Sequence, residues 1–81
     1  MKEHETFLNL QAEIEEEYWS ACEKFSGFHS THEGYAVIKE ELDELWDAIK
    51  KNRPTIELKG EAIQVAAMAL RFLTDICQNG K

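Results

Sequence analysis

The sequence predicts an all-α protein built from three helices. Apolar residues recur every three or four positions over three long stretches, as amphipathic helices require. Turn and capping residues separate these stretches, and no segment alternates apolar and polar residues as a half-buried strand does. With 81 residues, of which 43% are hydrophobic, the chain suffices for one domain with a small core. We expect residues 1–81 to form a single domain of antiparallel helices joined by short loops.

The first predicted helix covers about residues 5–25. Trp19 lies about 100° around this helix from Tyr18, so it is either a flank of the core or an aromatic wall for a ligand. Gly27 is a candidate left-handed residue at the end of the helix. The apolar line of this helix consists of Phe7, Leu10, Ile14, Tyr18, Ala21 and Phe25.

The second predicted helix covers residues 32–51, after a capping box formed by Ser30 and Glu33. Each of these two side chains is expected to bond the free backbone N–H of the other. Pro54 disfavours helix at the residue before it, which ends this segment. The predicted core line consists of Tyr35, Ile38, Leu42, Leu45 and Ile49, with Trp46 at its edge.

The third predicted helix, residues 57–78, is apolar on two faces. One face carries Ile63, Ala67, Leu70, Thr74 and Cys77, and the other carries Val65, Met68, Phe72 and Ile76. A helix that is apolar on most of its circumference is buried on most of it. Because three helices in one subunit are expected to cover only one of these faces, we expect a dimer or tetramer through this helix. Such self-association would complete a larger helical bundle.

Charge and terminal composition exclude several classes of protein. The formal net charge of -7 argues against a nucleic-acid partner, since phosphate binding depends on Lys and Arg. The longest apolar run, residues 65–70, is too short to span a membrane, and the N-terminus lacks the apolar region of a signal peptide. We therefore expect a cytoplasmic protein with no membrane partner, in which Cys22 and Cys77 are reduced and buried.

An acidic run in the second helix is the strongest candidate site. Glu40, Glu41 and Glu44 form one arc beside the apolar line, whereas Asp43 falls on an open face. Oxygen ligands of this kind are those that Mg²⁺ prefers. The alternative is a solvated acidic face without a ligand. Glu61 and Gln64 repeat the three-residue spacing on the third helix, so the predicted metal ligands are Glu41, Glu44, Glu61 and Gln64. Further along that helix, Arg71 and Asp75 are spaced as an ion pair.

These residues carry a resemblance to a known family. The segments Glu40-Glu41-Leu42-Asp43-Glu44 and Glu61-Ala62-Ile63-Gln64 resemble the E-E-x-x-E … E-x-x-D signature of MazG-like, all-alpha nucleoside triphosphate pyrophosphohydrolases. The context His32-Glu33-Gly34-Tyr35, together with residues 61–71, also resembles the short phage and prophage members, and the resemblance covers roughly half the chain. It implies Mg²⁺-dependent (or Mn²⁺-dependent) hydrolysis of a (deoxy)nucleoside triphosphate to the monophosphate and pyrophosphate.

Carried over residue by residue, the resemblance implies that Glu41, Glu44 and Glu61 hold the metal. Glu40 would hold a second metal or orient the attacking water. Gln64 departs from the family pattern, which has Asp at this position. A neutral amide still offers an oxygen ligand, but it removes a negative charge and a potential base.

Two functional hypotheses follow from this pattern. The first is a nucleotide hydrolase whose base pocket is lined by aromatic residues such as Trp19 or Trp46. The second is a catalytically inactive helical oligomerisation or interaction module on the same scaffold. Gln64 favours the second hypothesis, and the acidic set of Glu40, Glu41, Glu44 and Glu61 favours the first.

Overall fold

The computed structural model describes residues 2–78, and every regular element in this range is a helix. The helices are α1 (Lys2–Lys24), α2 (Thr31–Lys50) and α3 (Thr55–Phe72). A π-helical segment, Leu73–Gln78, continues α3 to the end of the described chain. The predicted all-α class is therefore confirmed, and the predicted helix ends lie within one turn of the observed ones, apart from this change of helix type.

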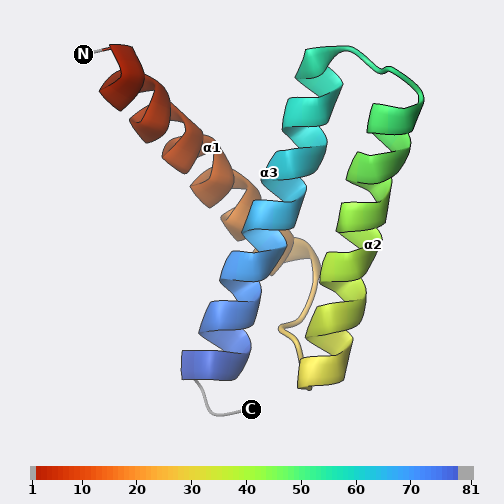
Figure 1. Cartoon of the computed structure of the whole chain (residues 1–81). Coiled ribbons are helices and arrows are strands. Elements are labelled where there is room, and N and C mark those ends of the chain that lie inside the picture. Colours follow the sequence, from red (N-terminus) through yellow and green to blue (C-terminus); the bar gives the residue numbers. More distant parts are fainter. Residues whose placement is uncertain (1, 79–81) are drawn as a thin grey trace.

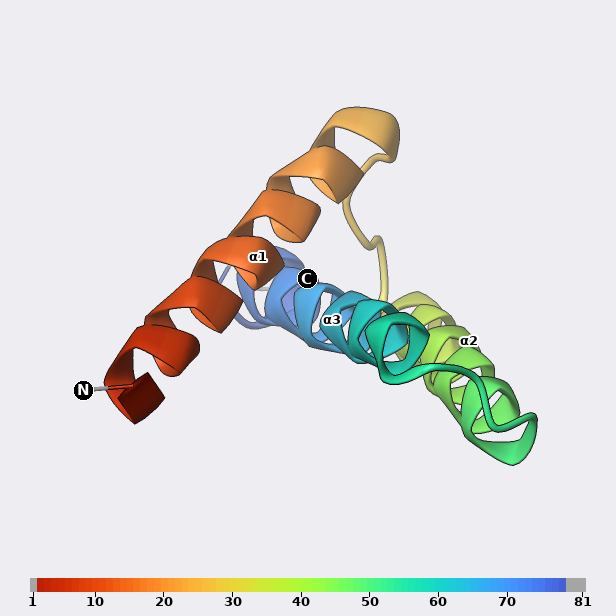
Figure 2. The same cartoon turned by 90° about the horizontal axis from the view of Figure 1, so that it is seen from above.

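The three helices are not all antiparallel. α2 and α3 form an antiparallel pair, whereas α1 crosses α3 steeply and hardly touches α2 (Figures 1 and 2). Near the crossing, the Tyr18 hydroxyl lies 2.9 Å from the Thr74 hydroxyl. The expectation of antiparallel neighbours is thus right for α2 and α3 and wrong for α1, because residues 25–30 connect α1 to α2 across the end of α3.

The core lies where α1 and the connection meet α3. α1 packs on one side of α3 and α2 on another, so a single chain covers the face with Met68 and Ile76 and part of the other face, on which Leu70 and Cys77 stay exposed. One chain thus covers more of this helix than expected, and self-association through residues 57–78 stays a prediction. The buried apolar cluster consists of Ala21, Phe28, Ala67, Met68 and Ile76.

α2 is rotated relative to the expected core line. Tyr35, Leu42 and Ile49 were predicted to be buried, but they are 64%, 50% and 44% exposed. The buried positions are instead Gly34 and Ala48. A side chain at Gly34 would meet the Phe72 ring, since a Cβ there would lie 2.5 Å from it. Small residues bring α2 close to α3 on this side, so these three large side chains turn outward. The prediction is right in part, because Ile38 and Leu45 are half-buried and Ile38 packs against the core.

The helix ends combine predicted and unpredicted features. As predicted, the Ser30 hydroxyl accepts a hydrogen bond from the backbone N–H of Glu33 (3.1 Å). The Glu33 carboxylate accepts from the N–H of His29 (2.6 Å) rather than from that of Ser30. The left-handed residue is Asn52 (φ 54°), which ends α2, and Gly27 does not have this conformation.

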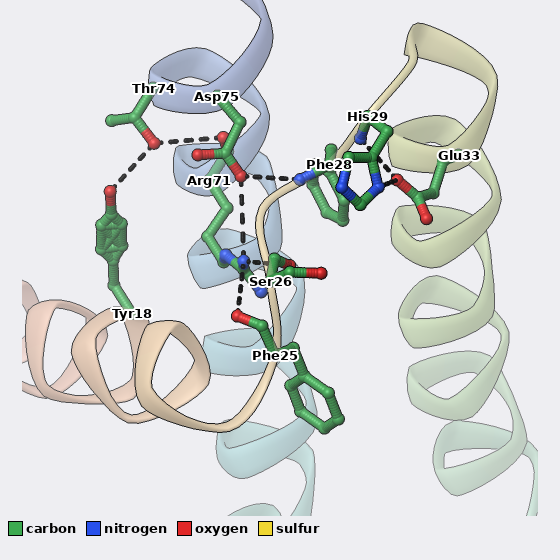
Figure 3. Close-up of polar contacts among 9 residues, drawn as sticks. All are labelled: Tyr18, Phe25, Ser26, Phe28, His29, Glu33, Arg71, Thr74 and Asp75. Atoms are coloured by element: carbon green, nitrogen blue, oxygen red, sulfur yellow. Dashed lines mark hydrogen bonds and ion pairs between the residues drawn. The ribbon is translucent and has the colours of Figure 1, made fainter.

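Arg71 ties the α1–α2 connection to α3 (Figure 3). Its buried side chain donates from Nη2 to the carbonyl oxygens of Ser26 (2.9 Å) and Phe25 (3.4 Å). Asp75 accepts the backbone N–H of Phe28 (2.9 Å) and lies 3.8 Å from Arg71 Nη2. The predicted ion pair is therefore present, and both partners also bind the connection.

Gly27 allows the connection to approach Asp75 closely. A Cβ at this position would lie 2.8 Å from the Asp75 carboxylate oxygen Oδ2, closer than real Cβ contacts allow. The glycine is therefore required by a close approach and not by a left-handed helix end.

The two cysteines are free, as predicted. Cys22 is half-buried, but Cys77 is exposed, so the prediction of two buried cysteines is wrong for Cys77. Within residues 2–78, none of the helices has both the length and the apolar composition that crossing a membrane requires.

The contacts of Arg71 predict that replacing this residue lowers the stability of the fold strongly. We expect Arg71→Met to lower the free energy of unfolding by about 3 kcal/mol, because it leaves two carbonyl groups without their donor and Asp75 without its counter-charge. Arg53→Met is a matched control, since Arg53 also pairs with the carboxylate four residues later but is exposed. An exposed pair contributes at most about 1 kcal/mol. Urea denaturation measures both changes, and equal losses would contradict the proposed role of Arg71.

Candidate metal centre

Three carboxylates from two helices converge between α2 and α3, where two of the residues are half-buried and Glu44 is exposed. Glu41 and Glu44 come from α2 and Glu61 comes from α3. Each offers one oxygen, and the three oxygens lie within 4.8 Å of one another. Residues three apart share one side of a helix, and the antiparallel pairing of α2 with α3 brings Glu61 opposite them. The structure thus unites three of the four predicted ligands.

The inward position of Glu41 makes the cluster electrostatically unfavourable. Burial raises the pKa of the Glu41 carboxyl, and the negative charges of Glu44, Glu61, Glu40 and Glu17 raise it further, in that order. Within residues 2–78, none of the three converging carboxylates has an ion pair or hydrogen bond to a neighbour. Like charges without a counter-charge destabilise one another, and a divalent cation reverses this repulsion. Their oxygen ligands suit a hard cation such as Mg²⁺.

Gln64, the fourth predicted ligand, lies beside the cluster. It is half-buried and lines the same recess as the three carboxylates, referred to below as the acidic recess. This recess is bounded by Glu41, Glu44, Glu57, Gly60, Glu61 and Gln64.

A larger cavity of about 670 Å³ adjoins the acidic recess. Glu41 and Gln64 line both, so the two spaces meet at these residues. Glu40 lines the larger cavity and is not among the three converging carboxylates, so the structure separates it from the metal ligands. The apolar wall of this cavity, referred to below as the inter-helix cavity, consists of Ala21, Phe25, Phe28, Val37 and Met68.

The two tryptophans lie outside these spaces. Trp19 and Trp46 are 56% and 55% exposed, and neither lines the acidic recess or the inter-helix cavity. Trp19 donates to the Glu15 carboxylate (3.4 Å), and Lys50 lies over the Trp46 ring. The expectation that they line a base pocket has no support from this geometry, since the aromatic residues in the cavity wall are Phe25 and Phe28.

Glu17 is a candidate residue that the sequence pattern missed. It lies on α1, lines the inter-helix cavity and contributes to the raised pKa of Glu41. Its position depends on how α1 crosses α3, which no local pattern in the sequence specifies.

No family model, curated protein or solved structure matches this chain. The resemblance to pyrophosphohydrolases therefore rests on the motif residues alone, and the site has to be argued from its own geometry.

The raised pKa of Glu41 predicts how stability depends on pH. A carboxyl whose pKa is higher in the folded than in the unfolded state binds protons more readily when folded. Its contribution therefore destabilises the fold at neutral pH and is relieved as the pH falls through the folded pKa towards the ordinary value of 4.5. We expect Glu41→Gln to remove this dependence.

Without metal at pH 7, Glu41→Gln should raise stability by roughly 0.5 kcal/mol, as relief of like-charge pairs does. This corresponds to about 2–4 °C in Tm. Asp43→Asn is the control, because Asp43 belongs to the same acidic run but pairs with Lys39 on an exposed face. Thermal melts between pH 5 and 7 measure both variants, and a lower Tm for Glu41→Gln would contradict the repulsion described here.

Proposed function

We propose that this chain is a cytoplasmic, Mg²⁺-dependent or Mn²⁺-dependent nucleoside triphosphate pyrophosphohydrolase. The observation that carries the proposal is the convergence of Glu41, Glu44 and Glu61, which have no ion-pair partner among residues 2–78. The motif resemblance adds the substrate class and the reaction. A structural role for these carboxylates is a poorer explanation, because their mutual repulsion destabilises the fold.

Glu41, Glu44 and Glu61 would hold the cation, and Gln64 offers an amide oxygen at the same recess. When bound, the cation neutralises the charge between these carboxylates and the phosphates of the substrate. The recess alone would repel a triphosphate. The cation requirement therefore follows from the charges of the site as well as from the resemblance.

Glu40 is the proposed general base. It lines the inter-helix cavity and follows directly before Glu41 in the sequence. The carboxylate takes a proton from a water molecule while the water oxygen attacks the α-phosphorus. The bond between the α-phosphorus and the oxygen that bridges to the β-phosphorus then breaks. Pyrophosphate leaves with the bonding electron pair, and the nucleoside monophosphate remains.

The inter-helix cavity is the proposed nucleoside site. Its volume of about 670 Å³ lies in the range of small-molecule sites, and its lining combines an apolar wall with a larger number of polar and charged residues. Phe28 and Met68 are buried and line this wall. Because the cavity meets the acidic recess at Glu41 and Gln64, a nucleoside bound there would place its α-phosphate beside the carboxylates.

The second candidate is a catalytically inactive interaction module, and Gln64 is the observation that favours it. Aspartate at this position would add a fourth negative ligand to the three converging carboxylates. With glutamine, the acidic recess keeps three charges and loses one possible base. The two functions are separated by activity in the wild type and by the effect of Gln64→Asp.

Self-association is proposed through α2 rather than through α3. Tyr35, Leu42 and Ile49 lie seven residues apart on the outer face of α2 and are all exposed, together with Trp46. The spacing is symmetric about Leu42, so a second copy packed antiparallel would place Tyr35 against Ile49 of the other copy. The small exposed fraction of Met68 and Ile76 makes α3 the poorer interface.

Cation binding predicts a large thermal shift. Ligand at about 100 times its dissociation constant adds roughly 2.7 kcal/mol to the free energy of unfolding. For a domain of this size, we expect Mg²⁺ or Mn²⁺ to raise the Tm by on the order of 10 °C or more. Glu61→Gln should lose most of this rise, whereas Asp43→Asn should keep it. A wild-type melt that neither cation changes, with or without a triphosphate, would refute the metal centre.

Pyrophosphate release from a panel of nucleoside triphosphates tests the reaction. We expect Glu40→Gln to lower kcat by about 10²–10⁴-fold, as loss of a general base does. The cation-induced shift in Tm should persist in this variant, because Glu40 is not one of the converging carboxylates. An inactive wild type that Gln64→Asp makes active would support the interaction module instead.

A further inference from the structure

We propose that Arg53, assisted by Lys51, binds the β- and γ-phosphates of the triphosphate and retains the pyrophosphate as it leaves. The inference rests on the proposed function and adds an orientation for the substrate. It assigns phosphate binding to two cationic residues that the motif resemblance does not include.

A third recess lies at the turn between α2 and α3, far from the α1–α2 connection (Figure 1). It shares Glu44, Glu57 and Glu61 with the acidic recess. The acidic recess in turn shares Glu41 and Gln64 with the inter-helix cavity. The three spaces therefore follow one another along the α2–α3 pair, each sharing lining residues with the next, and are referred to below as the groove.

The two ends of this groove differ in chemistry. The inter-helix cavity has the apolar wall, which suits a nucleoside, although Lys24 and Arg71 also line it. The recess at the turn lacks such a wall and is lined by Lys51 and Arg53 together with Asp47 and three glutamates. Arg71, at the nucleoside end, is committed to the carbonyl oxygens of Ser26 and Phe25. With the nucleoside in the apolar cavity and the α-phosphate at the carboxylates, the remaining phosphates extend towards the turn.

The distance from the carboxylates to Arg53 suits this arrangement. Glu57 precedes Glu61 by four residues, which is about one helical turn or 5.4 Å along α3. Its carboxylate oxygen Oε1 lies 3.1 Å from both Nε and Nη2 of Arg53. The guanidinium is thus held about one turn beyond the converging carboxylates, within the span of two linked phosphate groups.

The turn holds Arg53 in place and leaves donors free. Asn52 adopts φ 54°, and the backbone N–H of Arg53 donates to the carbonyl oxygen of Ala48 (3.0 Å). The Arg53 side chain is 52% exposed. Of the five N–H donors of a guanidinium, the Nε–H bonds Glu57 and Nη2 forms an ion pair with the same oxygen, so other donors can bind phosphate oxygens in the planar geometry that arginine favours.

Equilibrium binding separates this inference from the proposed function. The probes are α,β-methylene deoxynucleoside triphosphates, which cannot be cleaved at the proposed bond, and the matching monophosphates. Isothermal titration calorimetry in millimolar Mg²⁺ measures both with the full chain. We expect Arg53→Gln to weaken triphosphate binding about 10-fold or more, as loss of hydrogen bonds to a charged group does, and to leave monophosphate binding within about 2-fold. Lys51→Gln should show a smaller effect of the same kind.

Lys39→Gln is the matched control. It also removes one positive charge and an exposed ion pair with the carboxylate four residues later, but it lies outside the groove. If both variants weaken triphosphate binding equally, or if Arg53→Gln weakens monophosphate binding as much, the role of Arg53 is refuted while the proposed function stands. If the wild type binds and cleaves none of the triphosphates, both proposals fall.

Discussion

The buried guanidinium of Arg71 is the interaction on which the rest of this small fold depends. It binds the carbonyl oxygens of Phe25 and Ser26, where α1 ends, and lies beside Asp75, which binds Phe28. These contacts fix where the chain leaves α1 and hence how α1 crosses α3. Because α1 supplies one wall of the inter-helix cavity, the candidate nucleoside site depends on them. A core of few buried residues makes such directional contacts matter more than they do in a larger domain.

Local patterns in the sequence were sufficient to predict the three helices and the convergence of the acidic side chains. The capping of α2 by Ser30 follows from residue chemistry over a few positions. The convergence of Glu41 and Glu44 with Glu61 requires only a spacing of three residues and a short turn between antiparallel helices. These features depend on neighbours in the chain, so a single sequence predicts them.

The rotation of α2 and the course of α1 could not be predicted in this way. Tyr35 and Leu42 have the periodicity of a core line, yet Gly34 and Ala48 decide which side of α2 approaches α3. Close approach of small residues outweighs the number of large apolar side chains on the other face. Similarly, nothing within residues 2–24 indicates that Glu17 lies near the carboxylates of the other helices, because that proximity arises from a tertiary crossing.

The placement of the carboxylates on one local helix pair has a consequence for folding. Glu41, Glu44 and Glu61 all belong to the pair formed by α2 and α3, whose contacts are close in sequence and are therefore expected to form early. Docking of α1 closes a longer loop and requires the contacts of Arg71. A nascent hairpin would bring the three negative charges together before the core that opposes their repulsion is complete. On the proposal that these carboxylates bind a divalent cation, the same cation would also speed the folding of this chain by removing their repulsion.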